Sequence, residues 1–118
     1  MPGLEQPDKT VYTGEHLERE PNDRNRIVVS PPDEPDYLLP PRTDVEKISL
    51  NHPYDAFTWG YRGSGPHLTA GSLIADAYQD RETAQRNKQE LVEEYVSHLE
   101  QGEGWSITAG EIHDILTE

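Results

Sequence analysis

The sequence contains no cysteine, which excludes disulfide bonds and thiolate chemistry. Apolar residues are also scarce: they make up 32% of the 118 residues, which is low for a globular protein. No apolar run is long enough to span a bilayer. The N-terminal stretch MPGLEQPDKT has neither the basic start nor the apolar run of a secretion signal. These absences predict a cytoplasmic protein with one modest core and no membrane contact.

Basic residues are few, with Lys9, Lys47 and Lys88 as the only lysines and a formal net charge of -13. Attraction to phosphates requires a basic surface, so we expect no direct nucleic-acid binding. Acid excess together with few lysines indicates a protein of concentrated salt, because a Debye length of about 3 Å in molar salt screens repulsion between carboxylates. The alternative is an acidic surface that imitates nucleic acid and blocks a DNA-binding partner.

Four segments have the composition or the two-residue period of β-strands. In the last of them, Phe57, Trp59 and Tyr61 alternate with small or polar residues, which predicts a strand with an aromatic face. We interpret Trp59 and Tyr61 as core residues rather than a stacking platform. The predicted strands are residues 9–14, 26–30, a short edge segment at 37–39 within a proline-rich stretch, and 55–61.

The second half of the chain predicts three helices. The first starts at Pro66 and is apolar or small on nearly all sides, so it belongs in the middle of the core. Asp80 caps a second helix from residue 81 to about 100, and Thr108 and Glu111 form a capping box for a third. Strands first and helices last predict an α+β fold: a small, mostly antiparallel sheet of three to four strands packed by about three C-terminal helices. We expect one domain over residues 9–118 after a disordered tail at residues 1–8.

The stretch WGYRGSGP at residues 59–66 raises the question of a phosphate site. A nucleotide-triphosphate loop needs Lys and Ser or Thr after its second glycine, but Pro66 and His67 stand there, so that class of site is excluded. A weaker anion site remains open because the turn precedes a helix N-terminus. Its candidate residues are Arg62, Gly63, Ser64 and Gly65. The favoured alternative is a structural turn in which Ser64 caps the helix.

No catalytic or metal-binding motif is present. The five histidines, His16, His52, His67, His98 and His113, lack the spacing of a zinc site. Ser64 is not in the sequence context of an activated nucleophile. We therefore predict no enzyme activity, no cofactor and no metal.

The run NHPYDAFTWGYRGSGPHLTAGSLIAD, with VYTG upstream and GWSITAGEIHDIL downstream, resembles the DUF6166 family of small proteins of unknown function. The resemblance covers roughly residues 9–117 and implies no particular activity. His67 and residues 69–71 depart from the family's more usual Ala-Gln and Leu-Ala-Leu run. Members of the family are found in bacteria, haloarchaea and mobile elements, which agrees with the acidic composition. The matching residues, which we interpret as structural, are His52, Trp59, Gly60, Tyr61, Gly63, Ser64, Gly65, Pro66 and Leu68.

We therefore expect a non-enzymatic interaction or accessory protein of a halophile or its mobile elements. Its contact surface would include residues 62–66 and the proline-rich segment 31–41, and its partner would be a protein. The chain itself would be a monomer or a weak homo-oligomer. The alternative function is a module that binds an anion or phosphate group through the glycine-rich turn.

Overall fold

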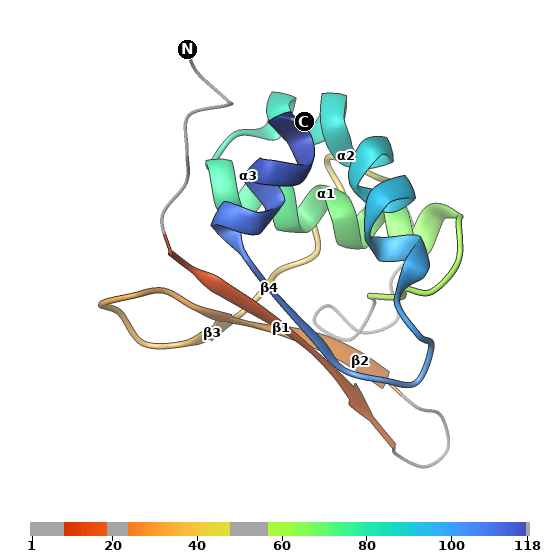
Figure 1. Ribbon diagram of the computed structural model, residues 1–118, viewed down its shortest axis with the longest axis horizontal. Helices are drawn as coiled ribbons and strands as arrows, with labels where there is room; N and C mark the ends of the chain where they lie inside the picture. Colours follow the sequence, from red (N-terminus) through yellow and green to blue (C-terminus); the bar gives the residue numbers. More distant parts are fainter. Residues whose placement is uncertain (1–8, 19–23, 48–56, 118) are drawn as a thin grey trace.

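The computed structural model describes residues 9–18, 24–47 and 57–117 (Figure 1). Its helices lie on one side of a four-stranded antiparallel sheet with strand order β3-β2-β1-β4, so the predicted α+β class is confirmed. The tail predicted at residues 1–8 lies outside the described residues. The strands are β1 (Val11–Leu17), β2 (Arg24–Ser30), β3 (Tyr37–Leu38) and β4 (Trp105–Thr108), and the helices are α1 (Ser64–Tyr78), α2 (Arg81–Glu94) and α3 (Ala109–Thr117), with a 3₁₀ turn η1 (Val96–His98) after α2.

The sheet is built on the hairpin of β1 and β2, which pair along their whole length from Val11 opposite Ser30 to Leu17 opposite Arg24. Successive side chains of a strand point to opposite faces of the sheet. Tyr12, Ile27 and Val29 are completely buried toward the helices, whereas residues 11, 13, 28 and 30, which alternate with them, are partly exposed. The strands predicted at 9–14 and 26–30 and the edge segment at 37–39 are therefore present, with small shifts in their ends.

The strand predicted at residues 55–61 is wrong: residues 57–59 pair with no strand, and residues 55 and 56 lie outside the described residues. The buried hydroxyl of Thr69 on α1 takes the place of a neighbouring strand. Thr69 Oγ1 accepts the Thr58 N–H at 3.2 Å and donates to the Thr58 C=O at 2.8 Å. The aromatic pattern is nevertheless the signal of a buried segment, because Phe57 and Trp59 are each only 1% exposed.

The fourth strand is β4, which lies after α2 in the chain and pairs with β1. The predicted order of strands first and helices last is therefore wrong at this element. The free edge of β4 is covered by side chains, as edges of natural sheets usually are. Tyr95 Oη donates to the Ser106 C=O at 3.4 Å, and the Thr108 N–H donates to Glu111 Oε1 at 2.9 Å. Burial, with a smaller contribution from the negative charge of Glu111, raises the pKa of Tyr95 to about 12.

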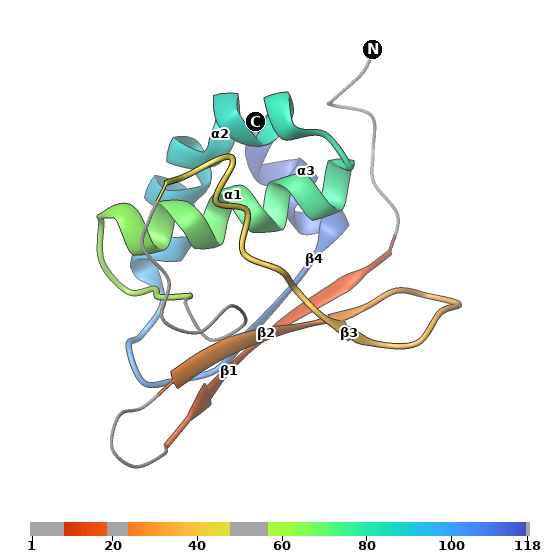
Figure 2. The same cartoon turned by 180° about the vertical axis from the view of Figure 1, so that it is seen from behind.

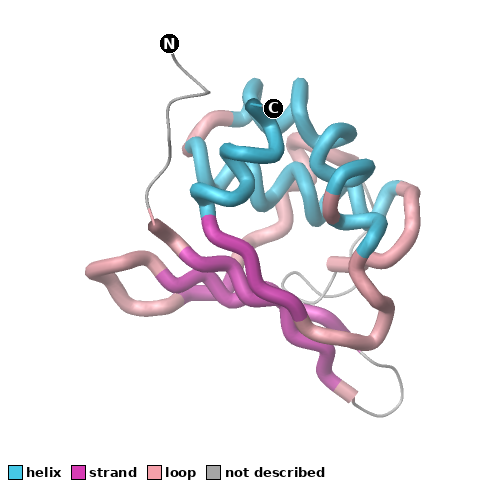
Figure 3. The backbone as a smooth tube through the Cα atoms, in the orientation of Figure 1, coloured by secondary structure: helices cyan, strands magenta, loops and turns pink. Residues whose placement is uncertain are grey.

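Helix α1 lies at the centre of the molecule, between the sheet and α2 (Figure 3). Leu68, Leu73 and Ile74 are completely buried, and so are the small residues between them. Small side chains allow close approach: a Cβ on Gly71 would lie 2.8 Å from Val45 Cγ1. The prediction of a helix buried on nearly all sides is confirmed.

Helices α2 and α3 have the predicted N-termini. Asp80 caps α2 by accepting the Thr83 N–H, and Thr108 and Glu111 form the reciprocal bonds of a capping box before α3. Helix α2 ends at Glu94, not near residue 100, because Tyr95 has φ -140 and the chain continues as η1. The apolar side chains at the end of α2 and the start of η1 face the core, with Leu91, Val92 and Val96 buried.

Candidate functional site

The glycine-rich turn is anchored by Trp59, whose side chain is 1% exposed. Its indole N–H donates to the Glu103 C=O at 3.2 Å. Its ring meets that of Trp105 edge to face, with 5.2 Å between the ring centroids. This geometry is favourable for two aromatic rings. The two contacts tie the turn to Glu103 and to the first residue of β4. Trp59 is therefore part of the core.

Two glycines of the turn are required by close packing. Gly60 has φ +89, its N–H donates to the Val96 C=O at 3.0 Å, and a Cβ there would lie 2.7 Å from the Leu99 carbonyl oxygen. Only glycine adopts this conformation without strain. A Cβ on Gly65 would collide with Thr58 Oγ1 and would lie 2.9 Å from the Tyr61 hydroxyl. Neither glycine needs a ligand to explain it.

Tyr61 corrects one expectation, because it is 42% exposed and not a core residue. Its hydroxyl lies 3.0 Å from Thr58 Oγ1 and beside Gly65, and its ring lies beside Gly63. The side chain therefore covers the start of α1 from the solvent side. The two-residue period could not reveal this, because the segment turns at Gly60 instead of continuing as a strand.

The four candidate anion-binding residues lie together at the N-terminus of α1. Gly63 is the N-cap residue, and no side chain caps the helix. The predicted capping role of Ser64 is wrong because Ser64 is already the first helical residue, so its hydroxyl is not at the capping position. Arg62 is exposed and forms no ion pair with any residue that the structure describes. The Gly63 C=O accepts both the backbone N–H and Nδ1–H of His67, at 3.1 and 2.8 Å.

The remaining motif residues have structural positions or lie outside the structure. Pro66 and Leu68 are buried in the first turns of α1, and His52 lies outside the described residues. Within residues 9–18, 24–47 and 57–117, no group of three or more histidine, aspartate or glutamate side chains is arranged to hold a metal ion. No helix in these ranges is long and apolar enough to cross a membrane.

The other end of α1 carries an arrangement that sequence reasoning missed. The Asp76 carboxylate accepts the hydroxyls of Tyr12 on β1 and Tyr37 on β3, each at 2.7 Å. It thereby fixes the helix to the sheet and to the β2–β3 arm, by which we mean residues 31–38. The arm projects beyond the rest of the sheet in Figure 1, and in Figure 2 the chain that follows it crosses α1. Nothing in the sequence distinguishes Asp76 from the other acidic residues, because its partners are 39 and 64 positions away.

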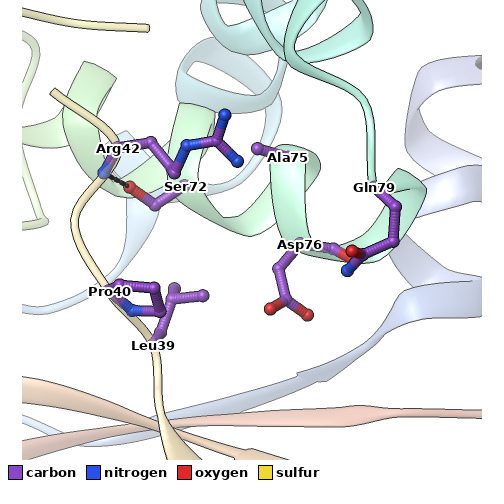
Figure 4. Close-up of a pocket in the computed structure, with 7 residues that line it drawn as sticks. All are labelled: Leu39, Pro40, Arg42, Ser72, Ala75, Asp76 and Gln79. Carbon is purple, nitrogen blue, oxygen red and sulfur yellow. Dashed lines mark hydrogen bonds between the residues drawn. The ribbon is translucent and has the colours of Figure 1, made fainter. Parts of the chain in front are cut away.

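Two cavities border Asp76. The first, which we call the Arg42 cavity, has a volume of about 190 Å³ and lies between α1 and the chain after β3 (Figure 4). The second has a volume of about 330 Å³ and lies under the arm, beside Glu34 and Tyr37. Asp76 and Gln79 line both cavities. Gln79, at the end of α1, has the left-handed conformation with φ 53.

The Arg42 guanidinium group at the first cavity forms an ion pair with Asp44. Arg42 Nε and Nη2 each donate to Asp44 at 2.8 Å. This bidentate contact, assisted by the charge of Asp76 and opposed by partial burial, raises the pKa of Arg42. The same contact lowers the pKa of Asp44. Both groups therefore stay charged at neutral pH.

Comparison with known proteins gives a family without a known activity. The model of a family described as "Family of unknown function (DUF6166)" matches residues 12–118. The chain belongs to this family. Searches of the curated proteins and of the solved structures found no match. Membership in DUF6166 therefore agrees with the resemblance seen in the sequence and leaves the function to be argued from the structure.

We expect the glycine-rich turn to bind no anion at low millimolar concentration. Thr58 and Tyr61 cover Gly65, and Pro66 has no N–H to donate, so few donors of the helix N-terminus remain for a ligand. The measurement is a sulfate titration at constant ionic strength that follows the amide signals of Gly63, Ser64 and Gly65. The exposed amide of Gly102 is the control for general salt effects. Saturable shifts at the three turn amides, lost in Arg62→Gln, would establish an anion site instead.

Proposed function

We propose that this chain is a non-enzymatic accessory protein of a halophile that binds a partner protein with a basic surface through the β2–β3 arm. The observation that carries the proposal is the position of exposed apolar side chains. Among the described residues, the large apolar side chains that are exposed are Tyr37 at 42%, Leu38 at 37% and Tyr61 at 42%. Two of the three are the consecutive residues of β3 in the arm, so one apolar side chain is exposed on each face of this edge strand. Aromatic side chains are enriched at protein-binding surfaces.

The charge of the arm supports a basic partner. Asp33, Glu34 and Asp36 are exposed, and the arm contains no lysine or arginine. A negatively charged rim around an apolar centre favours a partner with basic residues around an apolar pocket, since complementary charge steers association. The edge strand β3 also offers backbone hydrogen-bonding groups to a partner. Leu39 N–H donates to the Ile27 C=O at 2.9 Å. Because alternate residues of an antiparallel strand face opposite neighbours, Leu38 directs its own N–H and C=O away from β2. An added strand of a partner would pair with such an edge.

Site-specific photo-crosslinking tests the arm as the contact surface. A photoreactive residue replaces Leu38, or Gln85 on the exposed face of α2 as a matched control, and the chain is expressed in haloarchaeal cells. We expect one adduct of defined mass at position 38, absent at position 85, with a partner whose contacting segment is basic. The double variant Asp33→Asn, Glu34→Gln should weaken that adduct. The same adducts at both positions, or none at position 38, would contradict the proposal.

Salt dependence of stability tests the halophilic part of the proposal. A net charge of -13 on a small chain produces repulsion in the folded state that concentrated salt screens. We expect the melting temperature to rise by about 10 °C or more between dilute buffer and molar KCl, which corresponds to about 2 kcal/mol for a chain of this size. Sucrose of equal osmolality is the uncharged control and should raise the melting temperature much less. A flat response to KCl would favour the alternative in which the acidic surface imitates nucleic acid.

A further inference from the structure

The Arg42 cavity has hydrogen-bond donors at one end and hydrogen-bond acceptors at the other. Arg42 and Ser72 lie at one end in Figure 4, and Asp76 and Gln79 lie at the other. Leu39, Pro40 and Ala75 supply the apolar part of its lining. Small-molecule sites have this character, with a mainly fixed apolar lining and a few polar groups that orient the ligand.

The Arg42 end has hydrogen-bond donors to spare. The guanidinium uses Nε and Nη2 for Asp44, and Nη1 has no acceptor among the described residues. The Ser72 side chain is completely buried, and its Oγ accepts the Arg42 backbone N–H at 2.9 Å. A hydroxyl group also has one proton to donate. Thr69 donates its proton to carbonyl groups, whereas that of Ser72 reaches no acceptor in the part of the chain that the structure describes. The buried Ser72 hydroxyl holds the Arg42 backbone in place, and the free Nη1 group of Arg42 suits a carboxylate.

The Asp76 end of the cavity has hydrogen-bond acceptors that are not fully used. Asp76 follows Ser72 by four residues, so the two side chains lie one helical turn apart on the same face of α1. Each Asp76 carboxylate oxygen accepts one tyrosine hydroxyl at 2.7 Å and retains a further lone pair. Gln79 Nε2 donates to the Asp76 C=O at 2.7 Å, which leaves the side-chain carbonyl oxygen of Gln79 as an acceptor. This end suits an ammonium group.

We propose that the Arg42 cavity binds a small zwitterion, namely an α-amino acid with a short side chain. Its carboxylate accepts from Arg42 Nη1, and its ammonium group donates to Asp76 and Gln79. The cavity volume of about 190 Å³ has room for a small amino acid such as glycine, alanine or proline. Asp76 repels a simple anion in the cavity, and Arg42 repels a simple cation. A zwitterion satisfies both ends and is not repelled by the net negative charge of the chain.

The test is an NMR titration of the full chain with glycine, alanine and proline in molar KCl. The amide signals of Ser72, Ala75 and Gln79 report on the cavity. Acetate and methylammonium are the matched half-probes, since each carries one of the two charged groups. We expect saturable shifts in the millimolar range for at least one amino acid, and at least about tenfold weaker binding of both half-probes, equal to about 1.4 kcal/mol.

Two arginine variants separate a role in binding from a role in folding. Arg42→Gln should weaken amino-acid binding about tenfold or more, because it removes the charge at the cavity. Arg81→Gln is the matched control: Arg81 also contacts Asp44, at 3.4 Å, but does not line the cavity. It should leave binding unchanged. Thermal unfolding confirms that each variant is folded. Absence of saturable shifts with all three amino acids, equal binding of acetate, or equal losses in Arg42→Gln and Arg81→Gln would each overturn the proposal. None of these outcomes depends on whether the arm binds a partner.

Discussion

One buried hydroxyl group, that of Thr69, holds the chain at residues 57–59 against α1. It serves both backbone groups of Thr58 and also lies 3.2 Å from the Gly65 C=O. Buried backbone groups without partners are costly, so this segment needs such a partner as long as no strand lies beside it. Phe57 and Trp59 flank Thr58 and fill the core on either side of this contact. The position of the aromatic residues therefore depends on a side chain of the helix.

The same constraint accounts for the course of the glycine-rich turn. With Thr58 fixed, the chain reverses at Gly60 and enters α1 at Ser64, and Gly60 and Gly65 are the residues that allow it to pass so close to its neighbours. Groups with unused hydrogen-bonding capacity lie at the opposite end of the helix, around Arg42 and Asp76. The small residues of α1 allow close packing near its N-terminus and border a cavity near its C-terminus.

The sequence was sufficient to predict the elements whose signals lie within a few neighbouring residues. The capping box at Thr108 and Glu111, the cap at Asp80 and the two long strands follow from chemistry within a few residues. It was insufficient where the deciding partner lies far along the chain. A two-residue period at 57–61 suggests a strand, but Thr69 determines the outcome, while the four residues of β4 are too few to show a period. The contact of Asp76 with two distant tyrosines has no local signal at all.

Hydrogen exchange at the Thr58 amide tests this account most directly, in the wild-type chain and in Thr69→Val and Thr69→Ser. We expect the wild-type amide to exchange only through global unfolding, unlike the exposed amide of Gly102. Valine keeps the shape of threonine but removes the hydroxyl, so protection should be lost and stability should fall by about 2 kcal/mol. Serine keeps the hydroxyl and should retain protection at a cost of about 1 kcal/mol for the lost methyl group. Rapid exchange of Thr58 in the wild-type chain, or full protection in Thr69→Val, would contradict the account.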